Sequence, residues 1–117
     1  MAERRQARVA HLVQAALGRL LLEEARDARL RTVTVSAVRM SPDLRVARVY
    51  VRSLDPIPDR AATLAALDHA TPFLRREVGR GLGLRATPEL RFAYDDLPDT
   101  ARRLDELLAE PEEEDPA

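Results

Sequence analysis

Arginine is the side chain with the clearest chemical use in this sequence, because all 19 basic residues are arginines. The planar guanidinium group can bind two oxygens of one phosphate at once, which suits a phosphate-rich partner. Residues 1–95 hold 17 arginines against 11 acidic residues, a net charge of +6, whereas residues 96–117 hold 2 against 9, a net charge of −7. A basic body with an acidic tail indicates a polyanion partner. A solvated, arginine-rich surface is the alternative that charge alone leaves open.

Groups that could catalyse a reaction are scarce. Ser36 and Ser41 share no motif with a histidine base, so the sequence does not support a hydrolytic triad. His11 and His69 are isolated from each other along the chain. The chain has no cysteine, which excludes disulfides and every metal site built on thiolates. We therefore expect a protein that is not an enzyme and that needs no cofactor.

Two further motifs resemble ligand sites but have simpler explanations. Asp95, Asp96 and Asp99 could hold Mg²⁺, yet a polar turn after a strand predicts the same residues. The sequence GRGLG at 79–83 follows a helix and precedes a strand, the reverse of the order in a nucleotide-binding loop. The end of the helix explains its glycines. We therefore expect no metal site.

The first element that must position the arginines is a helix. Residues 4–25 repeat apolar side chains at intervals of three and four, which predicts an amphipathic helix with one buried face. The side chains expected on that face are Val9, Leu12, Val13, Ala16, Leu17, Leu20 and Leu21.

A β-hairpin follows this helix. Residues 30–40 and 45–53 alternate and are rich in β-branched side chains, which predicts two strands. The sequence SPDL at 41–44 is typical of the tight turn that would join them. A change of phase between Val35 and Val38 indicates a β-bulge. In the second strand, Ala47, Val49 and Val51 are expected on one face, with Val46, Arg48, Tyr50 and Arg52 on the other.

A proline interrupts the next helical segment, residues 60–82, which begins after the helix-start residues Pro58 and Asp59. Thr71 is a good N-cap, and Pro72 suits the first position of a helix, where its missing N–H has no partner to lose. We therefore predict that this pair ends one helix and begins another, which stops at the glycines 81 and 83. The buried residues of the second helix are expected to be Phe73, Leu74, Val78 and Leu82.

The last predicted strand is TPELRFAYD at 87–95, with its large apolar side chains on one face. The order helix-strand-strand-helix-kink-helix-strand predicts an α+β fold with a three-stranded sheet and helices on one face. We place the domain at residues 1–98. Residues 99–117 form an acidic C-terminal tail, in which we expect a short helix followed by disorder.

Length and hydropathy limit the class of protein. The 117 residues are enough for one domain with a real core. No apolar run approaches the roughly 20 residues that a membrane-spanning helix needs. The N-terminus has no apolar region of the kind found in signal peptides. The expectation is a cytoplasmic protein that does not enter a membrane.

Two stretches carry a resemblance to a known family. VTVSAVRMSPDLRVARVYV at 33–51, followed by LRREVGRGLGLRATPELRFAYDD at 74–96, is similar to ribosome-binding factor A, an assembly factor of the bacterial small ribosomal subunit. The resemblance covers roughly residues 4–108. It implies a type II KH-like fold in which a helix kink with an Ala-x-Gly motif replaces the usual glycine loop. The matching residues here are Ala70, Thr71 and Pro72, so proline stands where the family usually has glycine.

The resemblance implies an RNA-binding assembly factor, with 16S rRNA and the 30S subunit as its partners. It would assist late maturation of 16S rRNA without catalysis, its arginines neutralising phosphates. The chain is expected to act as a monomer. A protein-interaction module that uses an open sheet face and the acidic tail is the alternative. The candidate RNA-binding residues are Arg4, Arg5, Arg8, Arg39, Arg45, Arg48, Arg75, Arg76, Arg80 and Arg85.

Overall fold

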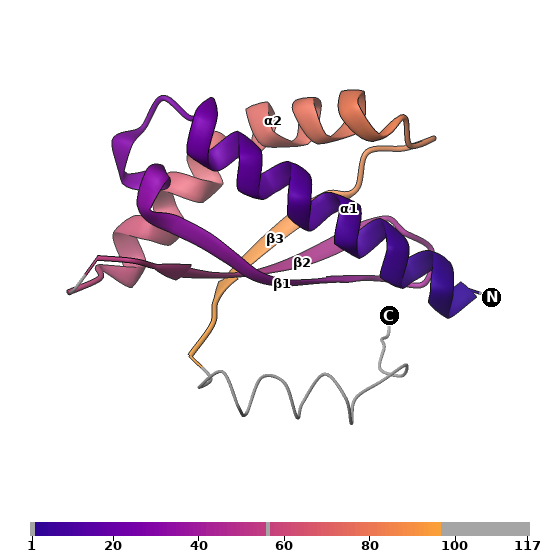
Figure 1. Ribbon diagram of the computed structural model, residues 1–117, viewed down its shortest axis with the longest axis horizontal. Helices are drawn as coiled ribbons and strands as arrows, with labels where there is room; N and C mark the ends of the chain where they lie inside the picture. The colour runs from indigo at the N-terminus through magenta and orange to yellow at the C-terminus, as the bar shows by residue number, and fades with distance from the viewer. Residues whose placement is uncertain (1, 56, 97–117) are drawn as a thin grey trace.

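The structure, a computed structural model, describes residues 2–55 and 57–96, so Asp99 and the predicted tail at 99–117 lie outside the described residues. Two helices lie on one face of a three-stranded sheet, as the sequence predicts (Figure 1). The elements are α1 (Ala2–Glu23), the 3-10 helix η1 (Ala28–Thr32), β1 (Val33–Met40), β2 (Val46–Ser53), α2 (Arg60–Leu82) and β3 (Glu89–Tyr94).

Helix α1 buries most of its predicted apolar face. The buried members are Val9, Val13, Leu17, Leu20 and Leu21. The prediction that Leu12 is buried is wrong, because 43% of its surface is exposed. Successive residues of a helix point about 100° apart, so Leu12 turns away from the sheet when Val13 faces it.

Two glutamines fix α1 along β1, an edge strand of the sheet. Gln6 Nε2 donates a hydrogen bond to the Met40 carbonyl (3.1 Å), and Gln14 Nε2 donates one to the Val35 carbonyl (3.0 Å). The helix therefore runs antiparallel to the strand. Its N-terminal end lies beside the turn that joins β1 to β2.

That turn is held by its own polar side chains, as predicted. Ser41 Oγ donates to Asp43 Oδ1 (2.7 Å) and accepts from the Val46 N–H (3.0 Å). Leu44 N–H donates to the Ser41 carbonyl (2.9 Å), and Leu44 has a positive φ of 62°, which closes the turn. The predicted bulge is confirmed, since the register of β1 against β2 shifts between Val35 and Ala37.

Both ends of α2 are where the sequence places them. The Asp59 carboxylate caps the first turn by accepting from the Ala62 N–H (3.0 Å). Gly83 follows the last turn with a left-handed φ of 61°, and its N–H donates to the Gly79 carbonyl (3.2 Å). A side chain at Gly83 would be strained in this conformation.

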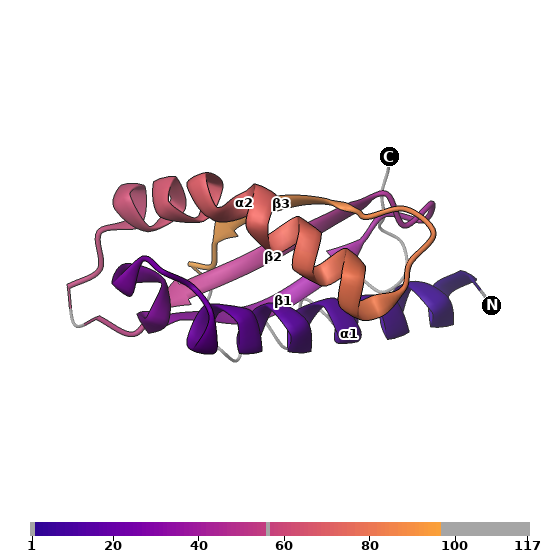
Figure 2. The same cartoon turned by 90° about the horizontal axis from the view of Figure 1, so that it is seen from above.

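The predicted break of this segment into two helices is wrong. The helix is continuous through Pro72, and Thr71 is no N-cap, because its Oγ1 donates to the Leu67 carbonyl one turn earlier (2.8 Å). Pro72 has no N–H to offer the Asp68 carbonyl, yet Leu74 just beyond it is fully buried. The two halves of α2 run in different directions (Figure 2). Ala70, Thr71 and Pro72 therefore lie within one bent helix, whose packing outweighs the local tendency to restart.

The sheet has the order β1-β2-β3, with β1 antiparallel to β2 and β2 parallel to β3. Helix α2 is the crossover that a parallel pair requires. In β2 the side chains of Ala47, Val49 and Val51 are fully buried under the helices, while the residues between them face the opposite side. We call these two sides the covered face and the open face of the sheet.

Candidate nucleic-acid interface

One end of the molecule gathers arginines from three segments. The bond from Gln6 to Met40 places the start of α1 beside the β1–β2 turn, and the Glu89 N–H donates to the Arg45 carbonyl (2.8 Å). The loop after α2 therefore reaches the same turn, and Figure 1 shows the N-terminus there. We call this region the basic end. Its exposed arginines are Arg4, Arg5, Arg8, Arg45 and Arg85.

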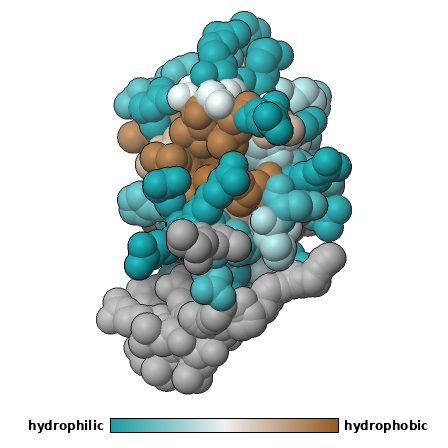
Figure 3. Space-filling model, turned by 90° about the vertical axis from the view of Figure 1, so that its right-hand side faces the viewer, coloured by the Kyte–Doolittle hydropathy of each residue, from teal (hydrophilic) through white to brown (hydrophobic). Residues whose placement is uncertain are grey.

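The basic end also has an apolar centre. Figure 3 looks at this side of the molecule and shows an apolar patch surrounded by hydrophilic side chains. Leu44 of the turn and Leu84 of the loop after α2 are only partly buried against the core. Guanidinium groups around an apolar patch can bind phosphates while the patch contacts the less polar parts of a nucleotide.

Arg75 is exposed, but the fold uses its guanidinium. Its Nε donates to the Pro88 carbonyl and its second terminal nitrogen donates to the Thr87 carbonyl, both at 3.0 Å. Gly79 also lets this loop lie close to α2, because a Cβ at position 79 would be only 2.3 Å from Thr87 Oγ1. Arg75 therefore ties the loop before β3 to α2. Sequence reasoning could not see this role, since both partners are backbone carbonyls 12 and 13 residues away.

Arg76 and Arg80 are the better candidates on α2. Both are mostly exposed, and both lie near the carboxylate of Glu77, at 3.7 Å and 3.6 Å. Arg76 also lies over the ring of Phe73, 5.8 Å from its centre. Exposed ion pairs of this kind contribute little to stability, so these guanidiniums can exchange Glu77 for a phosphate. Arg76 further lines a shallow depression beside Pro72, at the bend of α2.

The hairpin arginines do not join the basic end as one set. Arg45 lies in the turn, but Arg39 and Arg48 are directly opposite each other on the open face. Arg91 of β3 is in turn opposite Arg48, so three arginines cross the sheet in one line. We call Arg39, Arg48 and Arg91 the arginine row. Arg91 was missed by the sequence analysis, although alternation in β3 places it opposite to the buried Leu90.

Glu89 partly neutralises this row. Arg91 Nε donates to Glu89 Oε2 at 2.9 Å, and this hydrogen bond lowers the pKa of the Glu89 carboxyl. Both side chains are more than half exposed. Within residues 2–55 and 57–96, no carboxylate forms an ion pair with Arg48. The centre of the row therefore presents a positive charge.

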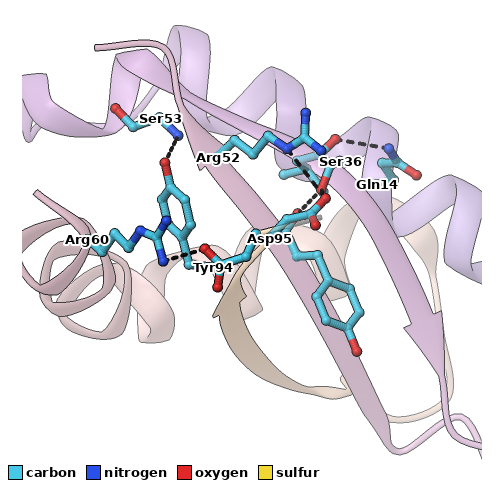
Figure 4. A network of polar contacts seen from close by, with 10 residues as sticks. Gln14, Ser36, Arg52, Ser53, Arg60, Tyr94 and Asp95 are labelled. Carbon is cyan, nitrogen blue, oxygen red and sulfur yellow. Dashed lines mark hydrogen bonds and ion pairs between the residues drawn. The ribbon is translucent and has the colours of Figure 1, made fainter. Parts of the chain in front are cut away.

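A buried carboxylate links the three strands at the other end of the open face (Figure 4). Asp95 is 3% exposed, and its Oδ2 accepts from Ser36 Oγ at 2.6 Å, across the sheet at the bulge in β1. Arg52 of β2 lies 3.5 Å from the same oxygen. Ser36 and Asp95 thus have partners within the sheet, as buried polar groups usually do.

The end of β3 is fixed by Tyr94 and Asp96. The Tyr94 hydroxyl accepts from the Ser53 N–H at 3.0 Å, and Arg60 lies over the Tyr94 ring, 4.7 Å from its centre (Figure 4). Arg60 also forms an ion pair with Asp96. These contacts hold the point where the chain leaves the sheet.

Other kinds of site find no support in the described part of the chain. Residues 2–55 and 57–96 contain no group of three or more metal-ligating side chains. None of the described helices is both long and apolar enough to span a membrane. His11 and His69 are exposed and lie on different helices.

Comparisons with known proteins agree with this architecture. The family model described as Ribosome-binding factor A matches residues 5–108. A protein of that name from Saccharopolyspora erythraea is 50% identical over 92 residues, which are 79% of this chain and 55% of the relative. The chain thus spans about half the length of that relative.

Solved structures point to the same family. The crystal structure of ribosome-binding factor A from Thermus thermophilus superposes with a TM-score of 0.68 at 30% identity, covering 76% of this chain and 94% of that one. A homology model of the Thermus thermophilus factor, fitted into a cryo-EM map of a 30S complex, gives a TM-score of 0.59 at 34% identity, covering 73% and 92%. By sequence and by fold, the chain belongs to the ribosome-binding factor A family.

Proposed function

We propose that this protein binds the small ribosomal subunit through 16S rRNA and assists late maturation of that RNA without catalysing a reaction. The observation that carries the proposal is the basic end, where three segments present exposed arginines around an apolar patch. Phosphate contacts of this kind supply most of the affinity for RNA and fix the orientation of the protein. A relative fitted into a map of a 30S complex supports the choice of partner.

The proposed contacts are the basic end together with Arg76 and Arg80 of α2. Arg75 is left out, because its hydrogen bonds to Thr87 and Pro88 occupy it. The bend of α2 at Pro72 sets the direction in which Arg76 and Arg80 point. The protein would work as a cytoplasmic monomer that holds an immature conformation of the RNA.

The test is co-sedimentation of the protein with small subunits at several salt concentrations. Replacing Arg4 and Arg8 by glutamate should lower affinity at least tenfold and reduce the slope of log affinity against log salt by about 1 to 2. The matched control replaces Arg26 and Arg31, exposed residues that follow the C-terminal end of α1, by glutamate. The control should bind almost normally.

Equal losses in both double variants would show a nonspecific charge effect and contradict the proposed interface. Normal binding by the Arg4 and Arg8 variant would remove the basic end from the contact. An affinity for subunits that does not depend on salt would favour the alternative, a protein-interaction module, over RNA binding.

A further inference from the structure

The open face of the sheet carries a feature that the proposed RNA contact leaves unused. Arg39, Arg48 and Arg91 face each other across adjacent strands, which lie about 4.8 Å apart. Like charges directly opposite each other destabilise a sheet. Among the described residues, Glu89 forms its ion pair with Arg91 and not with Arg48. An anionic partner bound to Arg48, at the centre of the row, would therefore relieve this repulsion.

Beside the row the open face is less polar. Tyr50 and Val46 are partly buried, and Ala93, directly opposite Tyr50, is exposed. Among the described residues, helices α1 and α2 lie on the other side of the sheet (Figure 1). A partner that fits this face needs carboxylates or phosphates next to apolar side chains.

The chain itself supplies such a partner. Strand β3 ends at Tyr94, and the next residue, Asp95, is buried beside Arg52. Residues 97–117, which we call the acidic segment, hold eight acidic residues against two arginines. The segment also has leucines at positions 104, 107 and 108, a spacing of three and four that places them on one side of a helical turn.

Length permits the contact. The eight residues of β2 span roughly 26 Å. The acidic segment has 21 residues, which reach roughly 70 Å when extended and roughly 30 Å as a helix. A tethered group also acts at an effective concentration of about millimolar, so even weak contacts would be made often.

We infer that the acidic segment, residues 97–117, docks on the open face of the sheet, with its carboxylates on the arginine row and its leucines against Tyr50. The open face is then an intramolecular interface, and an RNA phosphate could reach Arg48 only by displacing a carboxylate. This docking needs no ribosome, so it can be true or false independently of the proposed function.

The experiment uses the full chain and a nitroxide label. The sequence has no cysteine, so Ala109→Cys gives a single labelling site in the acidic segment. At low salt the label should abolish the amide signals of Arg48, Tyr50, Arg91 and Ala93, and leave those on the outer side of α1 intact. Near 1 M salt, where the Debye length is about 3 Å, the signals should largely return.

A charge reversal on the open face supplies the matched comparison. Arg48→Glu with Arg91→Glu should restore the signals at low salt, because the acidic segment is then repelled. The same reversal at Arg26 and Arg31 should leave the signals abolished. Since Arg48→Glu removes a like-charge contact with Arg39, we expect the variant to keep its fold, which the dispersion of its amide spectrum would show.

Three results would overturn the inference. Signal loss confined to the basic end would place the acidic segment on Arg4, Arg5 and Arg8 instead. Signal loss that also appears when nitroxide-labelled chains are mixed with separate, unlabelled and isotope-enriched chains would identify a second copy as the occupant. No loss on the open face, together with shifts of the Arg48 and Arg91 signals on adding a short RNA, would make this face an RNA surface.

Discussion

The covered and open faces of the sheet are built from alternate residues of the same strands, but different forces select their side chains. In β2, Ala47, Val49 and Val51 are completely buried, whereas Arg48 between them is exposed. On the covered face each side chain must match the volume left by α1 and α2. The described helices impose no such limit on the open face, so its residue types reflect charge and partners.

The largest effect should come from the covered face. Leu74→Ala removes a fully buried side chain of α2 and should lower the free energy of unfolding by about 2–5 kcal/mol, since it leaves a cavity. Leu12→Ala makes the same chemical change at a site that is 43% exposed and should cost less than about 1 kcal/mol. Urea denaturation measures both. Similar losses would mean that Leu12 also packs against the core.

Leu12 shows where the sequence analysis was right and where it was not. A spacing of three and four located the buried face of α1, but the edge of that face depends on what packs beside the helix. In β2 the alternation has a period of two, so the division between Val49 and Arg48 followed directly. The turn at Ser41 and the cap at Asp59 were also predictable, because each is a local side chain-backbone contact.

Tertiary contacts account for the failures. The local sequence favoured a restart at Thr71, yet burial of Leu74 keeps the helix intact through Pro72. The hydrogen bonds of Arg75 to the loop before β3 were likewise invisible in the sequence, because they depend on how the fold places that loop beside α2. The arginine row became visible only when the strand order placed Arg91 next to Arg48.

A second prediction asks whether the covered face or the proline sets the bend of α2. Pro72→Ala restores an N–H that can bond the Asp68 carbonyl and should stabilise the fold by about 1–3 kcal/mol. Because Leu67 and Leu74 are fully buried on either side of the bend, we expect the bend to remain. Urea denaturation and a crystal structure of the variant test this. A straighter helix, or a loss of stability, would show that the proline sets the geometry.

Two glycines of α2 offer a smaller, matched comparison. Gly79→Ala places a Cβ against Thr87 and should destabilise the fold by about 1–2 kcal/mol, the strain exceeding the gain in helix propensity. Gly81→Ala has nothing within 4 Å and should instead stabilise by about 0.5–1 kcal/mol. Thermal melts of both variants give the comparison. Stabilisation by Gly79→Ala would mean that the loop at Thr87 moves freely, and would weaken the structural role of Arg75.

The smallest effect is expected at an exposed ion pair outside the sheet, between Asp27 and Arg29 at the start of η1. Asp27 Oδ2 accepts from Arg29 at 2.8 Å, and this hydrogen bond lowers the pKa of the Asp27 carboxyl from 3.8 to about 2. Because the folded pKa is below the unfolded one, its stabilisation is present above about pH 4 and is lost as the pH falls toward 2. Asp27→Asn should therefore lower the melting temperature slightly at pH 7 and much less near pH 2.

A double-variant cycle with Arg29→Ala separates the ion pair from the cap that Asp27 gives η1 through the Arg29 N–H. Coupling as large at pH 2 as at pH 7 would contradict the assignment to the carboxylate charge. Zero coupling at pH 7 would leave only the cap, as is common for exposed ion pairs.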